Sequence, residues 1–331
     1  MKAIILKRTH EPPDFTEANL PEITASEVLV RLKAAALNHR DVWVQKGLYP
    51  GMKLPCILGS DGAGVIEKIG KLVSNEWFEK EVIINPGLNW GDNELVAGKS
   101  FHILGMPTNG CFAEYVKIDH QYLYEKPPHL NFFEAAALPL AGVTAFRALF
   151  TQSKLQKGEK VLITGIGGGV ALQTLLFARA LGCEVYVTSG SNEKIKKAVS
   201  YGATGGINYK MNNWHKVLLK EAGQFNVIID SAGGDNFGNL IDLAAPAGRI
   251  TFYGGTSGNI SNIIPSKVFF KQLTIKGTTM GNPEDFQHMV DFVNQKKIKP
   301  VIDQVFPLKE AETAFTRMEN GEQFGKIVLK I

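Results

Sequence analysis

The sequence is poor in cysteine, with three among its 331 residues. Cys56, Cys111 and Cys183 lie far apart, so they form neither a disulfide framework nor the Cys-x-x-Cys pairs of a structural zinc site. Long apolar runs are also missing: no stretch of about 18 apolar residues is present, which argues against a membrane-spanning helix. The segment Met1–Lys7 has no apolar run long enough for a signal peptide. We therefore expect a cytoplasmic protein that does not contact membranes.

A strong net charge is absent as well, because 36 Lys and Arg residues oppose 32 Asp and Glu residues, giving a formal charge of +4. No block of basic residues interleaved with aromatic ones occurs, so nothing indicates nucleic-acid binding. Hydrophobic residues make up 44% of the chain and charged residues 21%, which is typical of a folded globular protein. The chain is too long for one typical core, so two domains are expected.

The first third of the chain has the pattern of β-strands. Strands are predicted within Val28–Lys33, Gly62–Ile69, Trp77–Asn85 and Gly110–Ile118. The stretch from Pro86 to Gly110 is rich in Gly, Asn and Pro, which predicts a long loop. This part of the chain is therefore expected to form a β-rich domain.

Strands and helices alternate in the middle of the chain. Asn131 and Glu134 have the spacing of a capping box, which predicts the start of a helix. The apolar strand Val161–Thr164 precedes a helix over Ala171–Leu181, and the strand Glu184–Thr188 follows. Further elements are predicted as helices over Thr144–Phe150 and from Asn192, and as strands at Asn226–Asp230, Arg249–Tyr253 and Thr274–Gly277. This alternation predicts an α/β fold with a Rossmann-type, doubly wound parallel sheet.

The C-terminal part is expected to return to the β-rich domain. Helices are predicted at Pro283–Asn294 and Leu308–Asn320. A last strand is predicted at Lys326–Lys330, and it can supply the partner that an edge strand needs. We therefore expect residues 1–124 and 265–331 to form a β-rich catalytic domain, and residues 125–264 to form a dinucleotide-binding domain.

A glycine-rich turn joins the first strand and helix of the predicted parallel sheet. Its glycines are followed by Val170 at the start of the helix and comprise Gly165, Gly167, Gly168 and Gly169. Glycines there allow a tight turn and let the backbone approach a pyrophosphate, whose charge then lies at the helix N-terminus. A second strand follows about 20 residues on, as the dinucleotide-binding pattern requires. The alternative interpretation is a structural turn that binds no ligand.

The end of that second strand indicates which nicotinamide cofactor binds. An NAD-selective site places Asp or Glu there, to accept hydrogen bonds from the ribose 2′-hydroxyl. Here Ser189 supplies a neutral donor, and Lys194 follows on the next helix. A hydroxyl and an ammonium favour a 2′-phosphate, so the sequence predicts NADPH. Alternatively, Lys194 is only a solvated residue of the charged segment Asn192–Lys197.

With these motifs, the chain resembles the medium-chain dehydrogenase/reductase superfamily, in its zinc-independent quinone oxidoreductase branch, along essentially its whole length. Besides the glycine-rich turn, the segments that carry the resemblance are Asn38–Asp41, Gly47–Pro50, Leu58–Gly64, Leu138–Ala145 and Gly325–Leu329. The resemblance implies a GroES-like fold for the β-rich catalytic domain. It also implies a homodimer, because relatives often pair through the edge of the cofactor-domain sheet.

Zinc-dependent members of this family differ from the chain at each zinc ligand. They carry Cys at the position of Asn38, Gly-His-Glu at the positions of Gly59, Ser60 and Asp61, and a third ligand, usually Cys, near Leu140. A catalytic zinc ion takes typically three protein ligands, with thiolate or imidazole donors, and a water. Because Asn, Ser and Leu do not supply that set, no catalytic metal is expected.

The missing metal narrows the chemistry that the resemblance implies. Without a Lewis acid, the oxygen of a plain ketone is not polarised. A conjugated acceptor reacts more easily, because its developing negative charge spreads onto a distant oxygen that hydrogen-bond donors stabilise. The resemblance therefore implies NADPH-dependent hydride transfer to a quinone or an α,β-unsaturated carbonyl compound, with the protein supplying orientation and electrostatics.

The resemblance also gives single residues candidate catalytic roles. Asn38 is similar to a polar residue beside the nicotinamide, from which it can donate to the substrate oxygen. Arg40 and Asp41 are either a positioning pair or a structural ion pair. Tyr49 is either an acid or pocket wall, or a packed turn aromatic without chemistry. Thr144 stands where the family contacts the nicotinamide.

Cofactor contacts are expected from both domains. Tyr209 resembles a residue that packs by the adenosine phosphate, and Lys326 resembles a basic residue that reaches the cofactor from the other domain. Gly254 ends a strand at the sheet edge where the nicotinamide should lie. The full expected set is Thr144, Gly165, Gly167, Gly168, Gly169, Val170, Ser189, Lys194, Tyr209, Gly254 and Lys326.

Two other functions fit the same motifs. An alcohol dehydrogenase-like enzyme of this family would act on alcohols or aldehydes, and zinc required for turnover would reveal it. A non-catalytic protein would bind NADPH but turn over no quinone or enone.

His39 is either a proton shuttle or a hydrogen-bonded structural residue.

Overall fold

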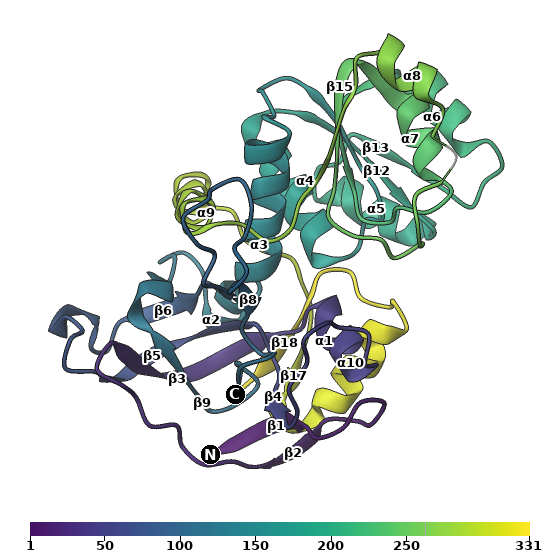
Figure 1. Cartoon of the computed structure of the whole chain (residues 1–331). Coiled ribbons are helices and arrows are strands. Elements are labelled where there is room, and N and C mark those ends of the chain that lie inside the picture. Colours follow the sequence, from purple (N-terminus) through teal and green to yellow (C-terminus); the bar gives the residue numbers. More distant parts are fainter. Residues whose placement is uncertain (262) are drawn as a thin grey trace. The chain divides into compact units, whose positions relative to one another are not determined.

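The computed structural model describes residues 1–261 and 263–331. By its internal contacts the chain divides into two compact units. Unit 1 comprises Met1–Val143 and Gly281–Ile331, and unit 2 comprises Thr144–Met280. Figure 1 labels the elements of both units. In the part of the chain that is described, no helix combines the length and the apolar character that crossing a bilayer requires.

Unit 1 is built on a mixed sheet whose central strand is β3 (Glu27–Ala36). One edge of β3 pairs antiparallel with β5 (Asp61–Ile69). The first half of β3 also pairs with β9 (Tyr115–Asp119), and its last residues pair with β18 (Lys326–Lys330). Figure 1 shows β3, β5 and β18 in one sheet. The predicted return of the last strand to the N-terminal unit is thereby confirmed.

The large sheet also contains β6 (Glu81–Ile84), β10 (Leu123–Glu125) and β17 (Ile302–Pro307). Two smaller sheets complete unit 1: one contains β1 (Lys2–Leu6), β2 (Asp14–Glu17) and β4 (Cys56–Ile57), and the other contains β7 (Gly87–Leu88) and β8 (His102–Ile103). The helices of unit 1 are α1 (His39–Gln45), α2 (Phe132–Ala136), the start of α3 (Pro139–Phe146), α9 (Pro283–Lys296) and α10 (Ala311–Glu319). Short 3₁₀ turns lie at Asn75–Trp77, His120–Tyr122 and Leu308–Glu310.

Helix α2 of unit 1 begins where side chains replace missing backbone partners. Asn131 caps α2 by accepting a hydrogen bond from the Glu134 N–H at 2.9 Å, and the Glu134 carboxylate accepts one from the Asn131 N–H, also at 2.9 Å. The predicted capping box is therefore confirmed. Helix α10 packs against α1, and the rings of Phe112 and Phe315 meet edge to face in the core, 6.2 Å apart.

Unit 2 contains a parallel sheet in the order β13-β12-β11-β14-β15-β16. The strands are β11 (Lys160–Ile163), β12 (Glu184–Ser189), β13 (Gly205–Asn208), β14 (Phe225–Asp230), β15 (Ala244–Phe252) and β16 (Thr274–Gly277). The helices are α4 (Gly169–Leu181), α5 (Asn192–Ser200), α6 (Trp214–Ala222), α7 (Phe237–Leu243) and α8 (Pro265–Phe270). The chain winds outward from β11 in both directions, as a doubly wound fold does.

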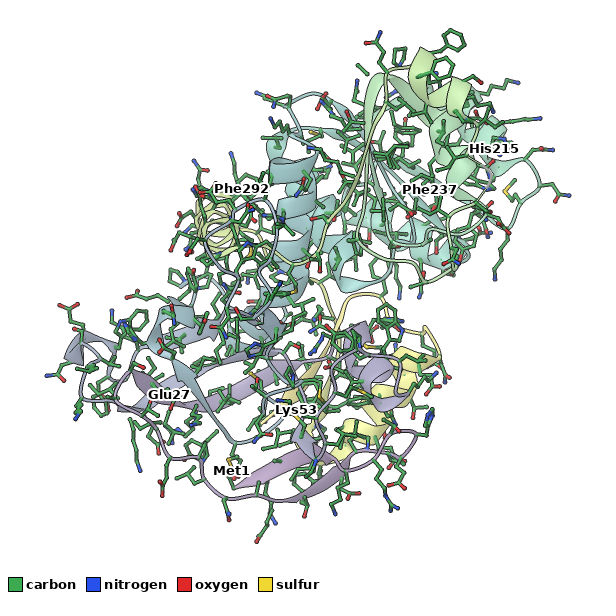
Figure 2. The ribbon with its side chains drawn as sticks, in the orientation of Figure 1. Met1, Glu27, Lys53, His215, Phe237 and Phe292 are labelled. Atoms are coloured by element: carbon green, nitrogen blue, oxygen red, sulfur yellow. The ribbon has the colours of Figure 1, made fainter. Side chains whose placement is uncertain are left out.

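Both faces of this parallel sheet are buried. Val161, Leu162 and Ile163 are neighbours in β11 whose side chains alternate between the faces, and each is 0% exposed. Leu162 packs in a core cluster with residues of α6 and α7, among them Phe237, which Figure 2 labels. The predicted Rossmann-type fold is confirmed.

Several element boundaries differ from the predicted ones. The helix predicted over Thr144–Phe150 is α-helical only as far as Phe146, and continues as a π-helix over Arg147–Gln152. The strand predicted within Trp77–Asn85 begins only at Glu81, because the backbone around Lys80 turns first. The predicted long loop contains the short antiparallel pair of β7 with β8.

The units also begin and end at other residues than the expected domains. The expected boundaries follow residues 124 and 264, whereas the units meet within α3 and after Met280. One cause is β16, which pairs with β15 and so joins the parallel sheet. Which segments fold as independent domains stays a prediction.

Candidate active site

Three segments of unit 1 meet at the end of β3. Asn38 follows this strand, whereas Asp61 and Lys326 are the first residues of β5 and β18. Both of these strands run antiparallel to β3, so both begin beside its end. Ala36 accordingly pairs with Asp61 on one side and with Val328 on the other. The topology thus gathers three polar side chains from distant parts of the sequence at one end of the three adjacent strands β5, β3 and β18.

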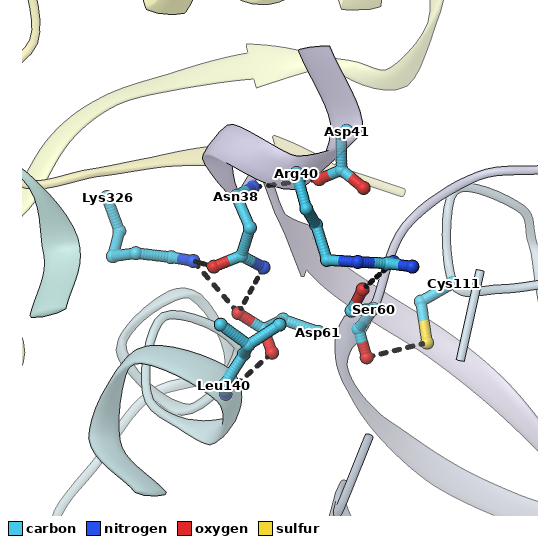
Figure 3. Close-up of polar contacts among 8 residues, drawn as sticks. All are labelled: Asn38, Arg40, Asp41, Ser60, Asp61, Cys111, Leu140 and Lys326. Atoms are coloured by element: carbon cyan, nitrogen blue, oxygen red, sulfur yellow. Dashed lines mark hydrogen bonds and ion pairs between the residues drawn. The ribbon is translucent and has the colours of Figure 1, made fainter. Parts of the chain in front are cut away.

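These three side chains form a closed hydrogen-bonded group, which Figure 3 shows. Lys326 Nζ donates to Asn38 Oδ1 at 2.6 Å and to Asp61 Oδ2 at 2.8 Å. Asn38 Nδ2 donates to the same Asp61 oxygen at 2.9 Å. Asp61 is 0% exposed, Lys326 3% and Asn38 8%. A buried ion pair is tolerated when its remaining polar atoms are also bonded, and this arrangement meets that condition.

The second oxygen of Asp61 holds the start of helix α3. Asp61 Oδ1 accepts a hydrogen bond from the backbone N–H of Leu140 at 2.8 Å. Leu140 follows Pro139 in the first turn of α3, where N–H groups have no partner within the helix. A carboxylate there satisfies one such group and interacts favourably with the helix dipole. Asp61 therefore connects the start of β5 to the start of α3, a role that the sequence did not predict.

A glycine allows β18 to begin beside β17 and so positions Lys326. Gly325 has a φ of +122°, in the region that favours glycine. A Cβ atom at Gly325 would lie 2.6 Å from the carbonyl oxygen of Val301. A larger residue would therefore displace the start of β18.

Arg40 is a buried cation with neutral oxygen partners. Its guanidinium donates to Ser60 Oγ at 2.7 Å and to the carbonyl oxygens of Leu104 and Met106, both at 3.2 Å. It also lies over the ring of Tyr49, 4.6 Å from the centroid. The expected pairing of Arg40 with Asp41 is not seen as an ion pair within 4.0 Å among the described residues. Instead, Arg40 links α1 to β5 and to the loop that follows β8.

Asp41 has one carboxylate oxygen without a partner. Asp41 Oδ2 accepts from the Asn38 backbone N–H at 2.8 Å, whereas Oδ1 is buried and no described residue donates to it. Burial raises the pKa of Asp41 to about 6, against the lowering effect of the nearby Arg40 charge. Near neutral pH this carboxyl group can therefore carry a proton, which an ordinary aspartate does not.

The side chains at the expected zinc positions do not suit a zinc ion. The Asn38 amide oxygen is bonded to an ammonium, the Ser60 hydroxyl accepts from a guanidinium, and Leu140 offers no donor. The nearby thiol of Cys111 is fully buried, and this burial raises its pKa well above the ordinary value. Across residues 1–261 and 263–331, no cluster of three His, Cys, Asp or Glu side chains is arranged to hold a metal. The donor set therefore disagrees with a zinc site.

The glycine-rich turn of unit 2 has the geometry of an anion-binding loop. Gly165 and Gly167 have φ values of +66° and +131°. The Ile166 N–H donates to the Thr188 carbonyl at 2.8 Å, which fixes the turn against the end of β12. Helix α4 begins after Gly168 without a side-chain cap, and a Cβ on Gly168 would meet no atom within 4 Å. The first N–H groups of α4 are thus open to a pyrophosphate, which fits the expected cofactor.

Polar and basic side chains gather around this turn. Ser189 is buried at the end of β12, and its hydroxyl accepts from the Ser191 N–H at 3.2 Å. The side chain of Lys194 lies over Gly167, since its Cδ would be 2.9 Å from a Cβ there. The Tyr209 hydroxyl would be equally close, at 2.9 Å, to a Cβ on Gly190. These residues thus lie together in unit 2, near the turn at which the cofactor is expected to bind.

Two features of this region were not predicted. Lys210 Cε would also lie 2.9 Å from a Cβ on Gly190, which adds a second ammonium beside the end of β12. At the ends of β11 and β14, Thr164 Oγ1 donates to the buried Asp230 at 2.6 Å. A Cβ on Gly254, the expected nicotinamide contact, would lie 2.6 Å from the Ser231 carbonyl oxygen, so β14 and β15 end in close contact.

The remaining predicted residues have simpler settings. Thr144 is buried within α3 and is 5% exposed. His39 packs edge to face against Trp43, and burial lowers its pKa, with a contribution from Lys46. The three cysteines are free and buried. Asn38, Asp41 and Lys326 are thus brought together in unit 1, whereas Tyr49 contacts Arg40.

Comparisons with known proteins agree with this architecture. Residues 24–128 match the family described as the alcohol dehydrogenase GroES-like domain, and residues 169–295 match the zinc-binding dehydrogenase family. The chain is 36% identical to a zinc-type alcohol dehydrogenase-like protein, YogA, of Leptosphaeria maculans, over 98% of this chain and 96% of that protein. It is 30% identical to the quinone oxidoreductase of Mus musculus, over 94% and 91% of the two chains.

A solved structure supports the same conclusion. The crystal structure of an NAD-dependent alcohol dehydrogenase superposes with a TM-score of 0.94 and 35% identity, and the match covers 100% of both chains. Such similarity over the whole length extends beyond the fold to the family. The chain is therefore an oxidoreductase of the medium-chain dehydrogenase/reductase superfamily, in which binding of a nicotinamide cofactor is expected.

Proposed function

We propose that this protein is an NADPH-dependent reductase of quinones or α,β-unsaturated carbonyl compounds that works without a catalytic metal. The observation that carries the proposal is the closed group of Asn38, Asp61 and Lys326, which lies where zinc-dependent relatives are expected to bind their metal. A cation and hydrogen-bond donors are fixed there, whereas zinc ligands are not. The quinone oxidoreductase of Mus musculus, 30% identical, supports this substrate class.

The chemistry divides between cofactor and protein. When bound, NADPH supplies a hydride, and the acceptor gains that hydride and one proton to give a hydroquinone or a saturated carbonyl compound. Negative charge then develops on the acceptor oxygen, and a donor such as the Asn38 amide stabilises it. We propose Asp41, whose pKa is raised to about 6, as a source of the proton in mildly acidic solution. For Tyr49, whose ring lies against the Arg40 guanidinium, we propose a role as a wall of the substrate site.

The cofactor choice rests on unit 2. The Ser189 hydroxyl and the ammonium groups of Lys194 and Lys210 surround the end of β12, and β12 does not end in a carboxylate. A 2′-phosphate gains charge-assisted hydrogen bonds from such groups, so NADPH is preferred over NADH. Lys326 and Thr144 are further proposed cofactor contacts.

The exposed edge of unit 2 supports a homodimer. β16 is the last strand of its sheet, and one of its edges has no neighbouring strand in the described chain. At the end of α8, shortly before β16 in the sequence, Phe269 and Phe270 are 60% and 81% exposed, with ring centroids 4.7 Å apart. Exposed edges and aromatic patches are usually covered, and a second copy covers both by symmetry.

The free cysteines suit a reducing compartment, and we propose the cytoplasm.

A second candidate is oxidation of alcohols or reduction of aldehydes. It is favoured by the 36% identical zinc-type alcohol dehydrogenase-like protein and by the NAD-dependent alcohol dehydrogenase structure. This candidate requires a way to polarise an isolated carbonyl oxygen.

One experiment separates the two candidates. Purified protein is mixed with NADPH or NADH and a panel of quinones, enones, aldehydes and alcohols, and nicotinamide absorbance is followed. Our proposal expects turnover of quinones or enones with NADPH that is unchanged by a chelator. Turnover of alcohols or aldehydes alone, lost with the chelator and restored by zinc, would contradict it.

A further inference from the structure

The amide group of Asn38 is held between two charged groups of opposite sign. Its oxygen accepts from the Lys326 ammonium at 2.6 Å, and its nitrogen donates to the Asp61 carboxylate at 2.9 Å. An ammonium can only donate and a carboxylate can only accept, so a single orientation of the amide satisfies both partners. The side chain is therefore fixed in orientation as well as in place, as Figure 3 shows.

One hydrogen of this amide is left for a ligand. An Asn side chain has two N–H donors, and Asp61 takes one of them. Within the described chain, no acceptor is found for the second. Asn38 retains 8% exposure, whereas Asp61 is fully buried, so Asn38 is the member of the group that a substrate can reach.

The ammonium also strengthens this donor. The amide is conjugated, so a positive charge bonded to its oxygen draws electron density from its nitrogen and makes the N–H a better donor. The effect is large at short distance in a buried site, where water does not screen the charge. Lys326 is 3% exposed and lies 2.6 Å from the amide oxygen.

We propose that Lys326 is a positioning residue for the reduction, which orients and polarises the Asn38 amide so that its second N–H binds the acceptor oxygen where negative charge develops. This inference rests on the proposed function and adds the origin of the electrostatic stabilisation. It differs from the expected role of Lys326 as a direct cofactor contact, because Lys326 acts here through Asn38. The two roles predict different behaviour of double variants.

The test is a double-mutant cycle of Asn38→Ala and Lys326→Gln. Gln keeps a donor beside Asn38 and Asp61 but removes the charge, so folding is disturbed less than by an apolar residue. Lys330→Gln, an exposed position on the same strand, is the matched control, and Lys326→Arg, which keeps a cation, tests rescue. Circular dichroism and thermal unfolding confirm that each variant is folded.

Three quantities are measured for every variant. The first is kcat with the best quinone or enone. The second is the Kd of 4-nitrophenolate, a stable oxyanion probe, measured by calorimetry on the protein without cofactor. The third is the Kd of NADPH, obtained by fluorescence titration. We expect Asn38→Ala to lower kcat about 100-fold. Lys326→Gln should lower kcat about 10-fold and weaken phenolate binding by a similar factor, as loss of one charge-assisted bond does. Lys326→Arg should recover most of the kcat and most of the affinity for phenolate, and Lys330→Gln should change neither quantity.

The decisive result is the double variant. If Lys326 acts through Asn38, Lys326→Gln has little further effect in the Asn38→Ala background. Equal effects of Lys326→Gln in both backgrounds, or a change in NADPH affinity alone, would overturn the inference and leave the proposed function standing. Conversely, a coupled phenolate cycle in a protein that turns over no quinone or enone would support the action of Lys326 through Asn38 on a bound oxyanion and reject the proposed function.

Discussion

Lys326 and Asp61 form an ion pair with 2.8 Å between Nζ and Oδ2, although 265 positions separate them in the sequence. The two side chains are 4% and 0% exposed, so water screens neither charge. Each is the first residue of a strand that flanks β3, so the ion pair forms only when β5 and β18 are both paired with β3.

Removing one charge of this ion pair should destabilise the folded protein more than removing both charges. Lys326→Met leaves the Asp61 carboxylate buried without a counter-charge, and we expect a loss of about 3–5 kcal/mol in the free energy of unfolding. The double variant Lys326→Met with Asp61→Asn should recover most of it, because no lone charge then remains. Denaturant unfolding followed by tryptophan fluorescence measures both. Additive losses would show that the pair does not act as a unit.

Asp41 predicts an unusual pH dependence. Its pKa is raised from 3.8 to about 6 in the folded protein, so folding favours the protonated form. The resulting contribution of Asp41 to the free energy of unfolding is fully present below about pH 4. It decreases as the pH rises through 6 and is absent above that pH. The difference of about two pH units corresponds to about 3 kcal/mol.

The variant Asp41→Asn tests this assignment, because it cannot ionise. Compared with the wild type, its free energy of unfolding should rise between pH 4 and pH 7 and level off above pH 7. Asp14→Asn, at an exposed position, serves as the control. A difference between Asp41→Asn and wild type that is independent of pH would contradict the raised pKa.

Ser189→Asp should reverse the cofactor preference. A carboxylate at the end of β12 repels a 2′-phosphate and accepts hydrogen bonds from a 2′-hydroxyl. We expect the Kd for NADPH to rise about 10- to 100-fold, equivalent to one lost hydrogen bond to a charged group of about 1.5–3 kcal/mol. Fluorescence titration with both cofactors measures this, and Ser200→Asp, at the exposed last residue of α5, is the control. Equal weakening of NADPH and NADH binding would point to a general distortion instead.

Phe270→Glu should separate the proposed dimer. Phe270 is 81% exposed at the end of α8, and a charge there prevents apolar association. Light scattering after gel filtration should give the mass of two chains for the wild type and of one for the variant. Leu72→Glu, which changes a 72% exposed residue of unit 1, should remain dimeric. A monomeric wild type would refute the homodimer directly.

Local sequence patterns predicted much of the fold. The capping box of Asn131 and Glu134 and the last strand were both found, because short-range chemistry determines each. The π-helix over Arg147–Gln152 was not predicted, because an α-helical pattern contains no signal for the wider turn. Strand β13 (Gly205–Asn208) was also missed, since two glycines weaken its strand pattern and its pairing with β12 is non-local.

The candidate site was predicted residue by residue but not as a network. Motif resemblance selected Asn38 and Lys326, yet assigned them to the substrate and the cofactor separately. Their contact depends on β18 pairing with β3, which only the three-dimensional structure reveals. Arg40 shows the opposite case: the resemblance suggested a pairing with Asp41, but successive helix residues point in different directions.

The arrangement of β3 between β5 and β18 has a consequence for biosynthesis. Asp61 leaves the ribosome long before Lys326 exists, since 265 further positions must be translated first. Until then, the carboxylate has no counter-ion and is better left in water than enclosed in a core. The growing polypeptide therefore has an electrostatic reason to postpone closing this part of unit 1 until its late strand has been made.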